Sequence, residues 1–150
     1  MASDDKELER LISEFIKTQG MCVIATCHDN VPRASAVEFF PDGTTMYILT
    51  EGGIKVENIA ANRNVSVAIH TQFTGWDSIK GVQLTGIAEI GKIGSKIFKD
   101  GVEAYRKRRR LNEVIIPEYM NVIRITPKRI EYLDTTLKAK GLGVKHELNY

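Results

Sequence analysis

The chain has 150 residues, an apolar content of 43% and a nearly balanced net charge of +2. This length suits one domain, residues 1–150, whose core needs no disulfide or structural metal. A net charge this close to zero implies no overall positive surface potential that would attract nucleic acid. No apolar run approaches the ~20 residues that a membrane-spanning helix needs.

The N-terminal residues 1–10 are acidic and polar, unlike a signal peptide, so we expect a cytoplasmic protein with no membrane partner. An amphipathic helix is predicted over residues 4–18, because apolar side chains recur at helical spacing and Gly20 gives a stop. Those side chains are Leu8, Leu11, Ile12, Phe15 and Ile16. We expect their face to lie on the rest of the fold.

From residue 22 onward the pattern changes to short β-type runs separated by turn signals. Strands are expected over 22–28, 31–40, 45–50, 65–70, 82–91 and 121–134, the last paired or bent around Pro127. Helical patterns interrupt them within 51–64 and 95–111, and Gly101 weakens the second. The sequence therefore predicts a mainly β fold, a small antiparallel β-barrel with flanking helices.

The domain divides into the N-terminal helix, a barrel over about residues 20–134, and a tail over 135–150. The tail has no clear period, so we expect it to be partly disordered or to cross to a partner. Cys22 and Cys27 stand an odd number of residues apart, on opposite faces of their strand, and are predicted to be buried, inert thiols. The histidines show no ligand spacing, so no metal site is predicted.

Lys55 follows the glycine pair at 52–53 and opens a short helix. A helix start presents free N–H groups and a positive dipole end, which together with a lysine suits a phosphate. Arg33 and Ser35 share one face of their predicted strand with Val37, and such a pair in a barrel favours an anionic ligand. Lys80 precedes a later strand as a third candidate cation, and a simple loop lysine is the alternative.

The order of these segments resembles the flavin-binding split-barrel family typified by pyridoxamine 5'-phosphate oxidase. The resemblance rests on "VPRASAVEF", "YILTEGGIKVENIAANRNVSVAI", "SIKGVQLTGIAEI" and "VIRITPKRIEYLD", and it covers roughly residues 8–134. It implies a split β-barrel homodimer with two FMN sites at the subunit interface. FAD or a deazaflavin is the alternative cofactor.

The resemblance also implies roles for single residues. Arg33 matches the arginine that faces the flavin phosphate, and Lys55 matches the phosphate lysine of the loop. The backbone that borders the flavin ring is matched by Ala34, Ser35, Ala36 and Val37. The pair at the end of the next strand is matched by Leu49 and Thr50. The pair that approaches the flavin from the other subunit is matched by Lys80 and Gly81. Lys80 is also the candidate hydrogen-bond donor to the reduced flavin ring.

This sequence departs from the true oxidase at several of these positions. Glu38 stands where the oxidase has a lysine, Ile54 precedes Lys55 in place of an arginine, and Gly81 replaces a glutamine. The Arg-x-His signature that grips the substrate phosphate is absent after residue 134. We therefore expect a flavoprotein that is not a pyridoxamine phosphate oxidase, with an unknown small-molecule substrate and a nicotinamide as one candidate donor.

Two further features have competing interpretations. Trp76, in the polar loop before Lys80, either fills an interface or core or forms a wall over the flavin ring. The five cations at 106–110 are interpreted as a solvated helix end, and the alternative is a surface for nucleic acid or another anionic partner. For the whole protein, the alternative to an enzyme is a flavin store or electron carrier.

Overall fold

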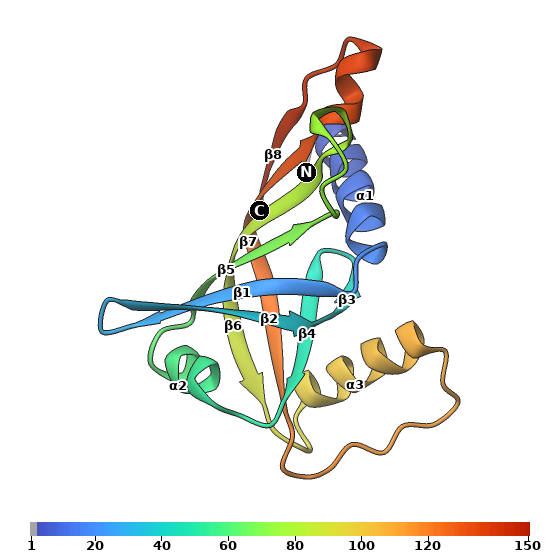
Figure 1. The fold of residues 1–150 in the computed structure, drawn as a ribbon. Coiled ribbons are helices and arrows are strands. Elements are labelled where there is room, and N and C mark those ends of the chain that lie inside the picture. Colours follow the sequence, from blue (N-terminus) through green and yellow to red (C-terminus); the bar gives the residue numbers. More distant parts are fainter. Residues whose placement is uncertain (1–2) are drawn as a thin grey trace.

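The computed structural model describes residues 3–150, and its centre is one antiparallel sheet that curls into a half-barrel (Figure 1). The strands are β1 (Met21–His28), β2 (Val31–Glu38), β3 (Phe40–Asp42), β4 (Thr45–Thr50), β5 (Asn64–His70), β6 (Lys80–Gly91), β7 (Asn121–Asp134) and β8 (Lys145–Asn149). The α-helices are α1 (Ser3–Lys17), α2 (Ile54–Ala61) and α3 (Lys96–Arg109), and short 3-10 turns are η1 (Trp76–Ser78) and η2 (Thr135–Lys140). The predicted mainly β fold is confirmed.

The strands follow the order β2-β1-β5-β6-β7-β4-β3, and β8 pairs with β7 beyond the end of β4. The two longest strands, β6 and β7, pair along their whole length and form the spine of the sheet. Their register shifts at Thr85 and Gly86, opposite Pro127, because proline has no N–H to give to the ladder. Residues 121–134 are therefore one bent strand.

Two apolar clusters hold the fold together. The larger lies between α1 and the concave side of the sheet, where Ile12 and Ile16 of α1 are fully buried. The smaller lies under α3, where Phe98 and Ala104 pack near Val122 of β7. The helix reaches the sheet closely because residue 101 is glycine, and an added Cβ there would lie 2.4 Å from a methyl of Val122.

The expectation for the C-terminal tail is wrong, because residues 135–150 fold back onto the same chain. They form η2 and then β8, whose Leu148 is 1% exposed in the core opposite Ile130. The Tyr150 hydroxyl lies 2.7 Å from that of Thr44, which joins the tail to the turn between β3 and β4. The sheet therefore extends beyond the predicted limit of residue 134.

The cysteines are both free, and the strand separates them as expected. Cys22 is 3% exposed in the core, whereas Cys27 lies on the opposite face and is only half-buried. The prediction of a buried thiol is confirmed for Cys22 and is only partly right for Cys27.

Candidate functional site

Strand β2 presents the first group of predicted site residues. Arg33 pairs with Thr26, and Ser35 pairs with Ile24, across the ladder to β1. Because directly opposed residues point to the same face and Ile24 lies in the core, Arg33 and Ser35 face the concave side. Val37 joins them on that face, as predicted. Ser35 and Val37 are half-buried, and Arg33 is exposed.

The loop before α2 has the backbone that its glycines predict. Gly52 and Gly53 have φ values of 143° and 96°, which side-chain-bearing residues rarely adopt. Thr50, buried at the end of β4, bonds through its hydroxyl to the backbone N–H and carbonyl of Gly52 at 3.3 and 3.2 Å. This loop delivers Lys55 to the first turn of α2, where it is half-buried.

A buried hydrogen bond fixes α2 against β1. The Asn58 amide donates to the Thr26 hydroxyl at 3.0 Å, and both residues are at most 8% exposed. Lys55 lies three residues before Asn58 and so on the same side of the helix, while Arg33 lies directly opposite Thr26. The two predicted phosphate cations therefore lie on the two elements that flank β1, because α2 packs against β1 and β2 pairs with it (Figure 1).

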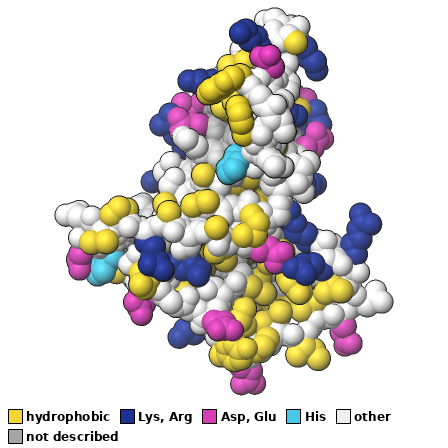
Figure 2. Space-filling model, viewed as in Figure 1, with side chains coloured by type: hydrophobic (Ala, Val, Ile, Leu, Met, Phe, Trp, Pro, Cys, Tyr) yellow, Lys and Arg dark blue, Asp and Glu magenta, His cyan; other side chains and the backbone are white. Residues whose placement is uncertain are grey.

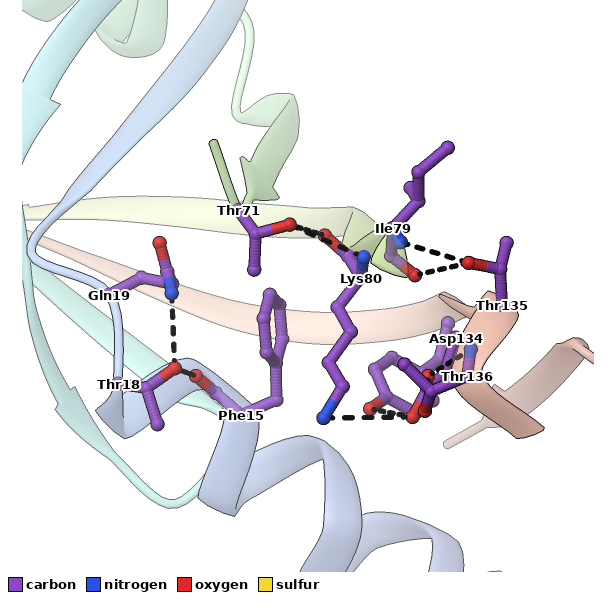
Figure 3. Close-up of polar contacts among 10 residues, drawn as sticks. Phe15, Thr18, Gln19, Thr71, Ile79, Lys80, Asp134, Thr135 and Thr136 are labelled. Carbon is purple, nitrogen blue, oxygen red and sulfur yellow. Dashed lines mark hydrogen bonds and ion pairs between the residues drawn. The ribbon is translucent and has the colours of Figure 1, made fainter. Parts of the chain in front are cut away.

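The start of β6 presents a different environment. The Lys80 side chain turns toward Asp134 and the α1 residue Phe15, and its ammonium lies 3.9 Å from the Asp134 carboxylate (Figure 3). Asp134 is 6% exposed and also accepts from the Tyr132 hydroxyl at 3.3 Å. Burial, with Asp134 beside it, raises the pKa of Tyr132 to about 12. Lys80 is thus the first residue of β6, tied to a buried carboxylate, and not a loop lysine.

Gly81 faces the opposite, convex side of the sheet, because side chains alternate along a strand and Val82 points into the core. It lies far from the phosphate cations of the same chain. Ser66 of β5 pairs with Ala25, the neighbour of Thr26 in β1. Four residues further along β5, His70 pairs with Gly81 of β6. With about 3.3 Å per residue and about 4.8 Å per strand, Arg33 and Gly81 are roughly 20 Å apart.

The convex side carries a cavity of about 720 Å³ over β5, β6, β7 and β8. Gly81, His70 and Gln83 contribute to its lining, together with Glu131 and Lys145. The His70 Nδ1 lies 2.7 Å from the Thr71 carbonyl, which leaves Nε2 available to a ligand. A smaller hollow of about 360 Å³ continues from Ala68 and His70 toward β1 and β2. Sequence spacing gave no signal for this cavity.

The aromatic loop before β6 is exposed. Trp76 is 78% exposed and stacks edge-on against Phe73 with 5.6 Å between the ring centroids. Trp76 does not fill the core of this chain, so the core part of that alternative is wrong, and a role at an interface stays a prediction. Hydrophobic side chains gather over this loop at the top of the molecule and along the β1–β2 hairpin (Figure 2).

The basic run at the end of α3 is not simply a solvated helix end. Arg106 pairs with Glu103 on the same helix, but Arg108 and Arg109 contact segments far away in the sequence. Arg108 donates to the carbonyl oxygens of Phe39 and Gln19 and is half-buried. The interpretation is therefore wrong for the half-buried Arg108, while Lys107, Arg109 and Arg110 are exposed, as it predicted, and Arg109 is in addition paired with Glu38.

Within residues 3–150, no three histidine, cysteine or acidic side chains gather in a way that could hold a metal ion. Over the same residues, every helix is too short or too polar to pass through a lipid bilayer.

The sequence model of the pyridoxamine 5'-phosphate oxidase family matches residues 8–134. The chain belongs to this family. A search of curated proteins found none that matches it.

Several solved structures share the fold of this chain at low sequence identity. General Stress Protein 26 from Bacillus anthracis has a TM-score of 0.66 and 20% identity, over 84% of this chain and 93% of its own. A FAD-binding protein from Mesorhizobium loti has a TM-score of 0.60 and 20% identity, over 83% and 89%. A heme binding protein from Mycobacterium smegmatis has a TM-score of 0.70 and 17% identity, over 99% and 59%. The FAD-binding and heme binding proteins show that solved proteins with this fold bind different cofactors.

Proposed function

We propose that this protein is an FMN-binding flavoprotein and an oxidoreductase that acts on a small molecule. The observation that carries the proposal is that β2 presents Arg33 and Ser35 on the concave face while the first turn of α2 presents Lys55, with α2 held to β1 by the Asn58–Thr26 contact. A phosphate monoester carries close to two negative charges at neutral pH, so two cations, a hydroxyl and the first-turn N–H groups of α2 suit it. The FAD-binding relative supports a flavin in this fold.

In this proposal each part of the flavin meets a different part of the chain. Arg33 and Lys55 hold the phosphate, and the β2 backbone from Ala34 to Val37 borders the ring, with Leu49 and Thr50 at the end of β4 beside it. The flavin supplies the chemistry, since its ring accepts and passes on a hydride or electrons. The protein orients the ring, excludes water from one face and keeps the phosphate charge neutralised.

A homodimer completes the site in this proposal. Arg33 and Gly81 are roughly 20 Å apart in one chain, so Gly81 would approach a flavin held by the other copy. The convex side offers a surface for that copy, because small apolar side chains line up on neighbouring strands there, at Val23, Ala25, Ala34, Ala36 and Ala68. Lys80 reaches a flavin in this arrangement only if its ammonium leaves Asp134.

The test of flavin binding is the visible spectrum of the pure protein, with the released cofactor identified by mass. We expect the absorption bands of oxidised flavin and the mass of FMN, or uptake of FMN by the colourless protein with micromolar or tighter affinity. A protein that takes up neither FMN nor FAD would overturn the proposal. Steady-state turnover with a nicotinamide donor then separates an enzyme from a flavin store or electron carrier.

The proposed oxidoreductase is not a pyridoxamine phosphate oxidase. Glu38 occupies the lysine position of the true oxidase and is paired with Arg109 at 2.7 Å, and β8 follows residue 134 without the Arg-x-His signature. The FMN-loaded protein, supplied with pyridoxamine phosphate and oxygen, should form no pyridoxal phosphate at enzymatic rates. Ordinary turnover in that assay would contradict this assignment.

A second candidate function is heme binding, and His70 is the observation that favours it. His70 lines the convex cavity, and its Nδ1 bonded to the Thr71 carbonyl leaves Nε2 as a ligand nitrogen, the arrangement that orients metal-binding histidines. The heme binding protein from Mycobacterium smegmatis shares the fold. Titration with heme should then give a sharp Soret band that His70→Ala removes, while Lys55→Ala leaves it in place.

A further inference from the structure

Arg108 makes contacts that a solvent-exposed helix end does not need. Its Nη1 donates to the Phe39 carbonyl at 2.7 Å, its Nη2 donates to the Gln19 carbonyl, and its guanidinium carbon lies 4.8 Å from the centre of the Phe39 ring. Burial lowers the pKa of Arg108, and nearby Glu38 opposes that effect. One side chain of α3 thus holds both the segment that enters β1 and the segment that leaves β2.

Arg109 adds a second contact at the same place. Its Nη2 lies 2.7 Å from both carboxylate oxygens of Glu38, the last residue of β2. Its guanidinium also lies 5.3 Å from the Tyr105 ring, which packs edge-on against Phe40 with 5.0 Å between centroids. Two successive residues of α3 therefore contact the last residue of β2 and the residue that follows it.

That connection is the corner of the barrel. Strands β2 and β3 are the two edges of the sheet, and only the fully buried Phe39 separates them in the sequence. Strand β2 has a single partner strand, β1, so no second ladder holds it. The end of β2 is fixed by its ladder to β1, by the Phe39 N–H bonded to the Gly20 carbonyl, and by the arginines of α3.

We propose that Arg108 and Arg109 form a latch that holds the corner between β2 and β3 and so positions β2 for the flavin. This inference rests on the proposed function, because β2 carries Arg33 and borders the ring. It makes Glu38 an anchor for α3, which explains an acidic residue at this position without a contact to substrate. It also makes the two arginines positioning residues, not a nucleic-acid surface.

The test uses the full-length protein and two independent ways to open the latch. Arg108→Met removes the donors but keeps the length of the side chain, and Arg109→Glu sets two carboxylates against each other. Each should weaken FMN by about tenfold, shift the visible bands of bound flavin and speed amide hydrogen exchange in β2. Amides of β7 should keep their rates, because the latch does not touch that strand's ladder to β6.

Two controls make the result specific. The double variant Glu38→Arg with Arg109→Glu restores the pair with its charges exchanged and should return FMN affinity, spectrum and β2 exchange to near wild type. Lys107→Glu, exposed on the same turn of α3, should change none of them. If the wild type binds no flavin, the proposed function fails. The rate of amide hydrogen exchange in β2 then tests the latch without any flavin measurement. Unchanged β2 exchange in both single variants, or no recovery in the exchanged pair, overturns it.

Discussion

Lys55 is the second residue of α2, two residues after Gly53, and is half-buried. If it holds the FMN phosphate, Lys55→Ala removes a charge-assisted hydrogen bond worth roughly 1.5–3 kcal/mol. FMN should then bind about 10- to 100-fold more weakly. Riboflavin, which lacks the phosphate, should bind as it does to the wild type in the same calorimetric titration.

The matched control is Lys99→Ala, an exposed lysine of α3 that should leave both affinities unchanged. Equal losses for FMN and riboflavin in Lys55→Ala would mean that the lysine supports the fold or the ring and not the phosphate.

The buried thiol of Cys22 should make the free energy of unfolding fall at alkaline pH. Burial raises the pKa of its thiol from 9.0 to about 12, so the folded state keeps a proton that the unfolded chain releases. This contribution to stability is complete below pH 9 and is lost as the pH rises toward 12. Tyr132, whose pKa burial also raises to about 12, acts in the same direction.

Denaturant unfolding between pH 8 and pH 11 should therefore show a falling free energy of unfolding, with a shallower slope for Cys22→Ala. Ile24→Ala is the matched control, since it removes a buried side chain of the same strand that does not titrate. Identical slopes for Cys22→Ala and the wild type would show that the thiol is not the source.

Local chemistry in the sequence marks some single residues as candidates, and the binding roles of Arg33 and Lys55 stay predictions. Arg33 and Lys55 stand out because cations beside a strand serine or a glycine-led helix start have few structural uses. Asn58 and Arg108 gave no such signal, because their partners lie 32 and 69 residues away and only the closed barrel brings them together. The tether of Lys80 to Asp134 is of the same kind.

At the scale of elements, α3 tests whether packing or helix propensity decides stability. Gly101→Ala on an isolated helix should stabilise by about 1 kcal/mol. Here the new Cβ would lie 2.4 Å from Val122 and 3.2 Å from Tyr47, so we expect a net loss of about 1–3 kcal/mol in the free energy of unfolding.

Chemical denaturation of Gly101→Ala, of Val122→Ala and of the double variant measures this balance. The double variant should be more stable than the sum of the two single losses implies, since the smaller residue makes room for the new methyl. A stabilised Gly101→Ala would mean that α3 does not pack as closely as described.

The sequence predicted most elements because their periods are strong, with five helical apolar positions in α1 and alternation in β5 and β6. It failed for β8, whose five residues Lys145–Asn149 place one large apolar side chain, Leu148, in the core. A strand that short is defined by the neighbour it pairs with, and one buried apolar side chain is too little for an alternating pattern to appear in the sequence.

At the scale of the whole molecule, the proposed shared site predicts that flavin and assembly depend on each other. FMN that binds only the dimer must stabilise it by mass action, so dilution in ultracentrifugation should show a tighter dimer with FMN than without. Trp76→Asp should weaken dimer and flavin together. The exposure of Trp76 makes this a clean change, because no core contact of the same chain is lost.

Lys138→Asp, also an exposed charge change near the same end of the molecule, is a control that should affect the dimer less. A monomeric variant that retains full affinity for FMN would exclude the shared site.

Strand β7 also determines when the chain can fold during synthesis. It pairs with β6 along its whole length, with β4 through residues 121–125 and with β8 through residues 129–133. Until residue 134 has left the ribosome, the hairpins β1–β2 and β3–β4 have no strand to connect them across the barrel. At about 5–20 residues per second, about four seconds or more pass between the synthesis of residue 50, where β4 ends, and that of residue 134. During this interval the apolar strands are made but unclosed, and a chaperone can protect them.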